Sequence, residues 1–478
     1  MALPPGPPLP ALVQTVLFLL YPVQFLHECQ RRYGDVFTVD TLIFGREVEI
    51  ADPEMVKQVF TADPDVVRAG EANEILGPLL GPRSVLLLDG AEHLRQRRLL
   101  MPPFHGERVL GYARTMREIT ERAVAEWRPG ERFALHPHMQ RITLDIILRT
   151  VFGVDEGAEL TDLRDALTRV LDRQSNPIDA ISQIPPLRRS FFGLTPWDGF
   201  LRDVKHADTL IYRQIRRRRA EPAQAGAKRP DVLAMLLEAR DEQGRPMTDS
   251  ELRDELVTLL VAGHETTATM LCWAFDLVLG DARVRSRLLS ELEAAGAGAP
   301  DADLAALGRL EYLDAVIKEV LRVRPVIPGV GRRLHAPMKL GKYDIPAGEL
   351  LVPVSWLAHH DKGAYPDAKA FQPERFLDTK PDPYVWFPFG GGARRCIGLA
   401  FALYEMKVVL ATVLTRVRLR KQSPEPAHIK LRGFTFVPEG GAEVVVESHI
   451  APGSRDLDGT GPAARVDGAL RRPVTFTP

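Results

Sequence analysis

The sequence predicts a mainly α-helical fold with a small β-rich subdomain and one long central helix. Apolar residues recur with helical spacing over most of the chain beyond its first strands. The stretch 248–280 keeps this pattern without a break, starts with the capping-box spacing TDSE, and would be ~50 Å long. Short alternating stretches near 36–39, 47–50 and 338–356 predict the β-rich part.

The other elements follow in order along the chain. A helix is predicted after the first two strands, and further helices follow over 91–101, 114–127 and 139–153. A gap rich in proline and aromatic residues, 175–200, has the length of a lid or a binding loop. A helix over 310–324 ends at Pro325, before strands that turn at PAG. The last segment, 452–478, has no periodicity and is expected to be a tail, so 1–451 is expected to form one domain.

The composition excludes several classes of protein. The 478 residues include 62 basic and 63 acidic side chains, so the net charge of −1 offers no overall attraction to nucleic acid or to an anionic membrane. Cys29, Cys272 and Cys396 are odd in number and far apart, which fits a reducing cytoplasm rather than a disulfide framework. We therefore expect a cytoplasmic, monomeric protein with no nucleic-acid partner.

The apolar N-terminal stretch 10–26 is too short to be a transmembrane anchor. It is interrupted by Gln14, Thr15, Pro22 and Gln24. No lysine or arginine precedes Arg31, so the charged region of a secretory signal is missing as well. We expect the segment 1–30 to pack on the body of the protein, with shallow contact with a membrane interface as the alternative.

The stretch FPFGGGARRCIG, 387–398, predicts a reactive or metal-binding thiol. Its glycines allow a flat ligand to approach the main chain, Phe389 could cover the thiol, and Arg394 could bind an acidic group. Helical patterning begins just after Cys396, which places the sulfur at a helix N-terminus that favours the thiolate. The alternative is a helix-capping loop with an incidental cysteine. Neither Cys29 in FLHECQRRYGD nor Cys272 on the apolar central helix has the setting of Cys396, and both are expected to be packed thiols.

This stretch resembles the haem-binding pattern F-x-x-G-x-R-x-C-x-G of the cytochrome P-450 superfamily. The matching residues are Phe389, Gly392, Arg394, Cys396 and Gly398. The resemblance extends from YGDVF near the start of the chain to the strands around 433–446. It implies a P-450 fold around one haem b, iron protoporphyrin IX, with Cys396 as the axial ligand of the iron. It also implies that Phe389, Gly390 and Gly398 line the cofactor.

The motif AGHETTA, 262–268, places an acid and a hydroxyl in the middle of the long helix. A kink or a solvated stripe is the alternative interpretation of Glu265 and Thr266. The motif resembles the superfamily's A-G-x-E/D-T, which implies that Glu265 and Thr266 relay protons during dioxygen activation and that Ala262 lies beside the cofactor.

Two further pairs share helix faces. Glu319 and Arg322 are three residues apart and would by themselves be taken for a surface ion pair. They match the superfamily's E-x-x-R, and Arg375 of PERF completes the structural network that the resemblance implies. His93 and Arg97 are four apart, and from the residues alone a solvated basic face is the better interpretation. The resemblance instead implies haem propionate contacts by His93, Arg97, Arg394 and Arg332, with Arg333 as an alternative to Arg332.

The function that the resemblance implies is monooxygenation of a lipophilic small molecule such as a fatty acid, terpenoid, steroid or polyketide. The pocket walls would come from 71–88, 175–200, Ala262, 324–330 and 433–436. The chain has no glycine-rich dinucleotide fingerprint and no cysteine cluster, so electrons would come from a ferredoxin or flavodoxin with an NAD(P)H-dependent reductase. A basic docking patch for that carrier is expected from Arg95, Arg98, Arg395 and Lys407.

Other classes remain open at this point. A haem-thiolate isomerase or dehydratase, or a peroxide-driven hydroxylase, would keep Cys396 without needing Glu265 and Thr266. A non-catalytic haem-binding sensor would need neither that pair nor a lipophilic pocket. A cysteine hydrolase would require a histidine beside Cys396, and none is near it in sequence.

Overall fold

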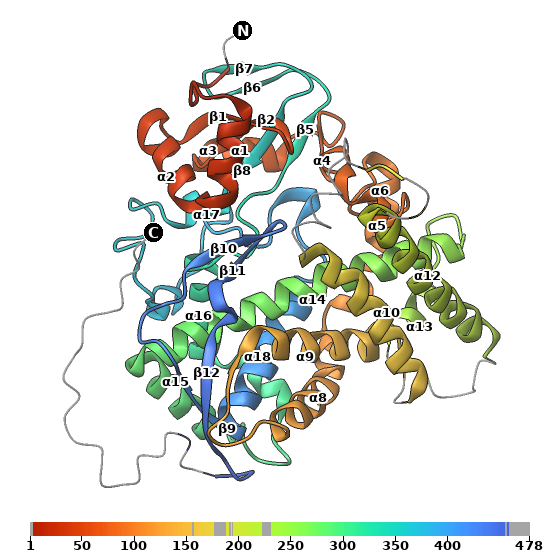
Figure 1. The fold of residues 1–478 in the computed structure, drawn as a ribbon, viewed down its shortest axis with the longest axis vertical. Helices are drawn as coiled ribbons and strands as arrows, with labels where there is room; N and C mark the ends of the chain where they lie inside the picture. The colour runs from red at the N-terminus through yellow and green to blue at the C-terminus, as the bar shows by residue number, and fades with distance from the viewer. Residues whose placement is uncertain are drawn as a thin grey trace.

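A computed structural model describes residues 3–154, 157–175, 188–190, 193, 195–221, 231–454 and 457. Figure 1 shows a helical body crossed by α14 and, above it, a smaller β-rich part next to the N-terminal helices. The expected mainly helical fold with a small β-rich subdomain is confirmed. Among the described helices, none is long and apolar enough to cross a membrane.

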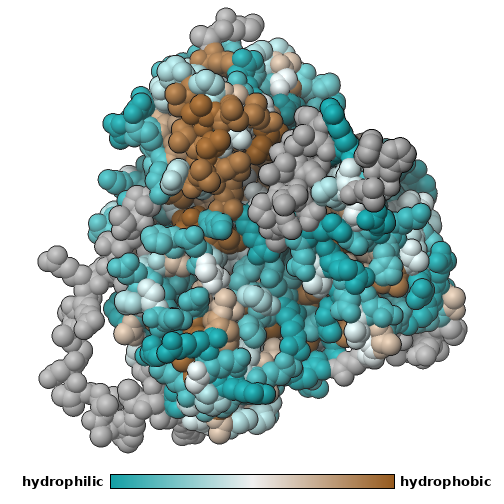
Figure 2. Space-filling view, in the orientation of Figure 1, coloured by the Kyte–Doolittle hydropathy of each residue, from teal (hydrophilic) through white to brown (hydrophobic). Residues whose placement is uncertain are grey.

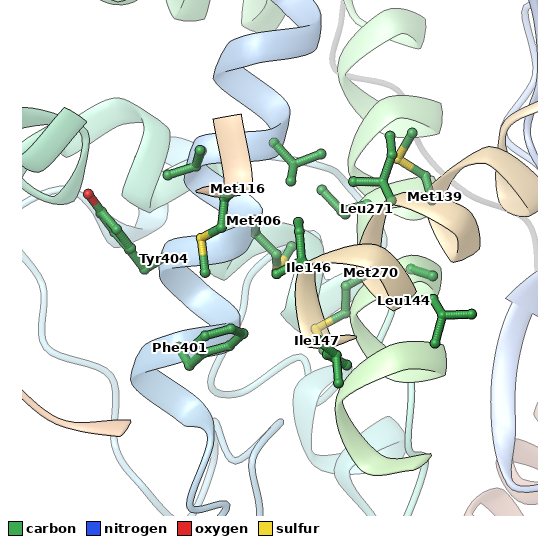
Figure 3. Close-up of a cluster of buried hydrophobic side chains, with 14 of the residues drawn as sticks. Met116, Met139, Leu144, Ile146, Ile147, Met270, Leu271, Phe401, Tyr404 and Met406 are labelled. Carbon is green, nitrogen blue, oxygen red and sulfur yellow. The ribbon is translucent and has the colours of Figure 1, made fainter. Parts of the chain in front are cut away.

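The long helix α14 (Asp249–Gly280) lies at the centre of the body, as the sequence predicts. Its N-terminus carries the expected capping box: the Thr248 hydroxyl accepts the Glu251 N–H at 3.2 Å, and the Glu251 carboxylate accepts the Thr248 N–H at 2.7 Å. The helices that pack on it are α9 (Leu135–Thr150), α12 (Pro196–Ala220), α16 (Glu311–Val323) and α18 (Leu399–Arg416). Figure 3 shows part of the core between α9, α14 and α18.

The approach of α9 to α14 is closest where α14 carries Gly263. A Cβ at this position would lie 3.1 Å from the Cδ1 of Ile147, so a larger residue would push the two helices apart. This crossing fixes which side chains of α9 can reach the motif 262–268.

The main sheet has five strands in the order β1-β2-β8-β5-β3. β1 and β2 form an antiparallel hairpin in which Val36 is opposite Ile50, and β2 pairs with β8 in parallel. Smaller sheets are β4-β12-β9, β6-β7 and the hairpin β10-β11. The strands are β1 (Val36–Thr41), β2 (Gly45–Ile50), β3 (Val67–Arg68), β4 (Arg132–Ala134), β5 (Arg332–Leu334), β6 (Met338–Leu340), β7 (Tyr343–Ile345), β8 (Leu350–Pro353), β9 (Val417–Lys421), β10 (Ile429–Arg432), β11 (Thr435–Pro438) and β12 (Glu443–His449).

Of the remaining helices, α3, α6 and α8 agree with the expected ones to within a few residues, and the others include several that the sequence did not predict. The remaining helices are α1 (Ala11–Leu20), α2 (Pro22–Tyr33), α3 (Pro53–Thr61), α4 (Ala69–Ala72), α5 (Gly77–Leu80), α6 (Gly90–Leu100), α7 (Glu107–Gly111), α8 (Ala113–Ala125), α10 (Ala158–Ser175), α13 (Val232–Glu238), α15 (Ala282–Ala294) and α17 (Ser355–His359). The expected binding loop 175–200 falls mostly outside the described residues, although α12 already begins at Pro196. Most of the expected tail 452–478 is outside them as well.

The N-terminal helix α1 packs on the body through polar side chains. Gln14 accepts the Asp40 N–H at 3.0 Å, and the Thr15 hydroxyl accepts the Leu42 N–H at 2.9 Å, which ties α1 to β1 and the turn after it. Leu17 and Phe18 of α1 also pack against the core, whereas Leu12 and Leu20 point outward and are 60% and 65% exposed. Figure 2 shows a large hydrophobic area in the upper part of the molecule, where this segment lies.

Candidate active site

The cysteine loop is held in place by its glycines and by α3. A Cβ at Gly392, which has φ +64°, would lie 2.0 Å from the Phe60 carbonyl oxygen, and one at Gly391 would enter the Phe60 ring. These two glycines therefore allow the loop to pack closely on α3. A Cβ at Gly398 would meet nothing within 4 Å, so that position leaves space beside the loop.

The Cys396 thiol is both accessible and desolvated. It is exposed, whereas Cys29 and Cys272 are buried as expected. Burial nevertheless raises the pKa of Cys396, and the Gly398 N–H and the charges of Arg97 and Arg395 only partly oppose this rise. A thiol that faces an enclosed space within the protein is both accessible and shielded from bulk water, which accounts for both observations.

The expected preference for the thiolate at the start of α18 is therefore wrong for the protein alone, because burial outweighs the helix terminus. A bound metal cation is the kind of partner that ionises such a thiol. The donor set at this site thus fits a thiolate-ligated metal.

Three arginines and His93, from α6, β5 and the cysteine loop, form one electrostatic cluster, and Arg97 links this cluster to the thiol. The pKa of His93 is lowered to about 4 by burial and by the nearby charges of Arg394, Arg97 and Arg332. Burial also lowers the pKa of Arg97, whose charge is felt by Cys396. Among the described residues, neither His93 nor Arg97 has a side-chain hydrogen bond or an ion pair. Closely spaced buried cations are stabilised by bound anions, so the cluster fits the two propionates of a haem.

Arg332 and Arg394 differ in how far the protein already neutralises them. The Arg394 guanidinium pairs with Asp89 and donates to the Val85 carbonyl at 3.1 Å. Arg332 is buried, donates to Gly331 at 2.8 Å, and has its pKa lowered to about 10 by burial and by Arg394. The alternative, Arg333, donates to the Gly348 carbonyl at 3.0 Å in an exposed setting, so Arg332 is the better candidate.

The acid and the hydroxyl of α14 do not contact each other. The Thr266 hydroxyl donates to the Ala262 carbonyl of its own helix at 2.6 Å, and Ala262 is exposed although it lies midway along this central helix. Glu265 instead accepts from Gln140 at 2.7 Å and lies 3.4 Å from the Nε2 of His136 and 3.7 Å from Arg432. These contacts lower the pKa of Glu265 despite its burial.

The structure brings Glu319, Arg322 and Arg375 together in the interior. Both Glu319 and Arg322 have fully buried side chains and form a bidentate pair with N–O distances of 2.7 and 2.8 Å. Arg375, in η5 (Pro373–Phe376), lies 3.5 Å from the Glu319 carboxylate. The surface ion pair that the spacing alone suggested is thus a buried one.

The expected basic docking patch is not a set of free cations. Arg95 pairs with Asp241 and Glu251, and Arg98 pairs with Glu242. Lys407 is buried and pairs with Asp314 at 2.6 Å. Arg395 is exposed and forms no ion pair with the described part of the chain.

The partners of Glu265 could not be found from the sequence. His136 and Gln140 lie on α9 and Arg432 on β10, in segments far from the motif and without a pattern of their own. Only the packing of α9 and the β10-β11 hairpin on α14 brings them to one carboxylate.

Comparisons with known proteins agree with this geometry. A model of the family described as Cytochrome P450 matches residues 4–442. The chain is 42% identical over 480 residues to a protein named cytochrome P450 135B1 in Mycobacterium tuberculosis, with 98% of each chain covered. It is 37% identical over 444 residues to one named cytochrome P450 135A1 from the same species, covering 92% of this chain and 94% of the relative.

Two solved structures share the fold. A retinoic acid-bound cyanobacterial CYP120A1 matches with a TM-score of 0.78 and 24% identity over 94% of this chain and 100% of that chain. The haem domain of a cytochrome P450DA mutant matches with a TM-score of 0.82 and 24% identity over 95% and 99%. The chain therefore belongs to the cytochrome P450 family, whose members are haem b-dependent monooxygenases.

Proposed function

We propose that this protein oxidises a lipophilic small molecule by inserting one oxygen atom of dioxygen, with Cys396 as the thiolate ligand of the haem iron. The observation that carries the proposal is the Cys396 thiol, which is accessible yet desolvated and lies within electrostatic reach of Arg97. When bound, the haem supplies the iron centre at which dioxygen is activated.

The chain's own residues hold the cofactor and handle protons. His93, Arg97 and Arg332 have positive or titratable groups that would bind the haem carboxylates, and Arg394 would do so in exchange with Asp89. Phe389, Gly390 and Gly398 would line the cofactor on the side of the thiol. Glu265 would take up a proton from solvent and pass it to the Thr266 hydroxyl. Glu319, Arg322 and Arg375 would hold the fold beneath the site.

A lipophilic substrate, such as a fatty acid, terpenoid, steroid or polyketide, is favoured by the apolar side chains offered by the expected walls. Leu86 and Leu87, Val261 and Ala262 on α14, and Val330 before β5 are partly or fully exposed apolar residues of those segments. A retinoic acid-bound protein of the same fold supports this substrate class.

The electrons would come from a ferredoxin or flavodoxin with an NAD(P)H-dependent reductase. The whole sequence has three cysteines, too few for an iron–sulfur cluster held by four thiolates in addition to the haem ligand. The near-zero net charge and the odd, separated thiols support a cytoplasmic setting, and we propose a monomer.

The test is the absorption spectrum of the dithionite-reduced protein under carbon monoxide, for the wild type, Cys396→Ala and the control Cys29→Ala. We expect a strongly red-shifted Soret band in the wild type and the control, and its loss in Cys396→Ala. A spectrum typical of histidine ligation in all three proteins, or the same band in Cys396→Ala, would contradict the proposed ligand.

A further inference from the structure

We infer that His136, Gln140 and Arg432 form a clamp that positions Glu265 and sets how readily this acid takes up a proton. The inference rests on the proposed proton role of Glu265 and deepens it. The three clamp residues do not reach Cys396 or the cations around it by any contact that the described residues show. They are positioning residues that act through Glu265.

The contacts enclose both oxygens of the Glu265 carboxylate. Oε2 accepts a hydrogen bond from the Gln140 amide at 2.7 Å. Oε1 is buried, has no hydrogen-bond partner among the described residues, and lies 3.4 Å from the His136 Nε2 and 3.7 Å from an Arg432 nitrogen. The donors come from two different elements, α9 and β10, so the carboxylate is held from both sides.

Arg432 also determines which nitrogen of His136 carries the proton. An Arg432 nitrogen lies 3.3 Å from the His136 Nδ1. A guanidinium can only donate, so Nδ1 acts as the acceptor and the ring proton resides on Nε2. Nε2 is the atom that faces the Glu265 Oε1. The same Nε2 lies 3.4 Å from the Thr269 hydroxyl, so the arginine orients the imidazole N–H toward both the acid and this hydroxyl.

Two contacts connect the elements around the clamp. Nε1 of Trp273 on α14 donates to the Phe436 carbonyl of β11 at 2.9 Å, which fastens the β10-β11 hairpin to the central helix. A Cβ at Gly441 would lie 3.2 Å from the Cβ of His136, so β12 and the turn before it approach this histidine closely. The clamp therefore depends on the seating of the hairpin as well as on α9.

The clamp holds the acid away from the alcohol. Glu265 accepts a hydrogen bond from Gln140 of α9 and lies 3.7 Å from Arg432 of β10, whereas the Thr266 hydroxyl donates to the Ala262 carbonyl. A proton from solvent that neutralises Glu265 weakens its attraction to Arg432 and frees the side chain to turn toward Thr266. The charged and titratable groups that face Glu265 are His136 of α9, Arg432 of β10, and His264 and Cys272 of α14 itself.

The test needs no knowledge of the substrate. The haem-loaded protein is supplied with a surrogate ferredoxin and its reductase but no substrate. Dioxygen is then reduced either to hydrogen peroxide, with two electrons and two protons, or to water, with four of each. The peroxide recovered per nicotinamide oxidised, measured across pH, therefore reports proton delivery. The variants are His136→Phe, Arg432→Gln and Gln140→Leu, each made with Glu265 and with Glu265→Gln.

The peroxide ratio should change with pH in a transition that is absent from Glu265→Gln and so belongs to Glu265. In each clamp variant we expect the midpoint of this transition to move to higher pH by about one unit, because donors and a cation that favour the carboxylate are lost. In the Glu265→Gln background the same changes should move nothing. His136→Gln keeps a donor and should therefore show a smaller shift than His136→Phe. His138→Phe is the matched control: its ring lies two residues away on α9 and is bonded to Trp127, so it should have no effect.

A second readout does not depend on turnover. The Glu265→Gln substitution changes how the thermal unfolding midpoint depends on pH. This change should be smaller in each clamp variant than in the wild type. An unchanged peroxide ratio in Glu265→Gln alone would refute the proposed proton role. The clamp would be overturned, and the proton role kept, if Glu265→Gln had its expected effect but the clamp variants shifted neither readout. The same conclusion would follow if the clamp variants shifted both readouts equally with Glu265 and with Glu265→Gln.

Discussion

Replacement of the buried Arg322 should strongly lower the free energy of unfolding of this protein. Its guanidinium is fully buried and donates to both oxygens of Glu319 and to the carbonyls of His359, Ala368 and Ala370, at 2.7 to 3.0 Å. Arg322→Met removes every one of these donors while keeping a long side chain that fills much of the space.

The magnitude follows from the groups left behind. Removing one partner of a buried ion pair costs about 3–5 kcal/mol. Each buried carbonyl that loses its donor costs a further ~1–3 kcal/mol, although these losses do not simply add. The total is on the order of 5 kcal/mol or more, which is comparable with the whole unfolding free energy of many proteins, ~5–15 kcal/mol. Glu319→Gln should cost less, because burial already raises the pKa of Glu319 against the effect of Arg322, and the amide oxygen can still accept.

The assay is urea unfolding followed by far-UV circular dichroism, with the yield of folded protein recorded alongside. The matched control is Arg31→Met, which breaks a bidentate pair with Glu28 at the same three-residue spacing, in an exposed position. We expect a large loss of midpoint or of folded protein for Arg322→Met, an intermediate loss for Glu319→Gln, and an unchanged midpoint for the control. Equal midpoints for Arg322→Met and the control would refute the reasoning that burial makes the difference.

Three further predictions concern other parts of the fold. Gly392→Ala should lower the unfolding midpoint and the haem content, since a Cβ would lie 2.0 Å from the Phe60 carbonyl oxygen; a wild-type haem content would contradict this. Thr248→Ala should cost about 1 kcal/mol in urea unfolding, because the hydroxyl that accepts the Glu251 N–H is lost, and Thr248→Ser should not. His359 is fully buried, with its pKa lowered to about 3 from 6.5. The unfolded state therefore binds a proton that the folded state does not, and stability is lost as pH falls below 6.5; His359→Gln should reduce this pH dependence, and an equal slope in both proteins would exclude the histidine as its cause.

The helices and most strands could be predicted because their signals are local. The TDSE capping box starts α14 at its expected place, and Pro325 follows the end of α16. The spacing of Glu319 and Arg322 likewise places them on one helix face whatever surrounds the helix. Whether that face is solvated or buried is not a local property, and the residues alone favoured the wrong answer.

The glycine-rich loop shows the same division. Its pattern indicates a special backbone, but the reason for Gly391 and Gly392 is the Phe60 residue on α3, more than 300 positions earlier in the chain. Similarly, the helix terminus after Cys396 favours a thiolate in isolation, and only the burial of the folded loop reverses that preference for the protein alone.

The sequence by itself indicated the family and the mainly helical fold and pointed to candidate chemistry-bearing residues, because these signals depend on spacing within single elements. Only the tertiary structure showed that Arg332 is buried, paired Arg394 with Asp89, and placed His136, Gln140 and Arg432 around Glu265. These relations join side chains from separate helices and strands, so they arise from the packing of α9 and the β10-β11 hairpin on α14 and have no counterpart in any short stretch of sequence.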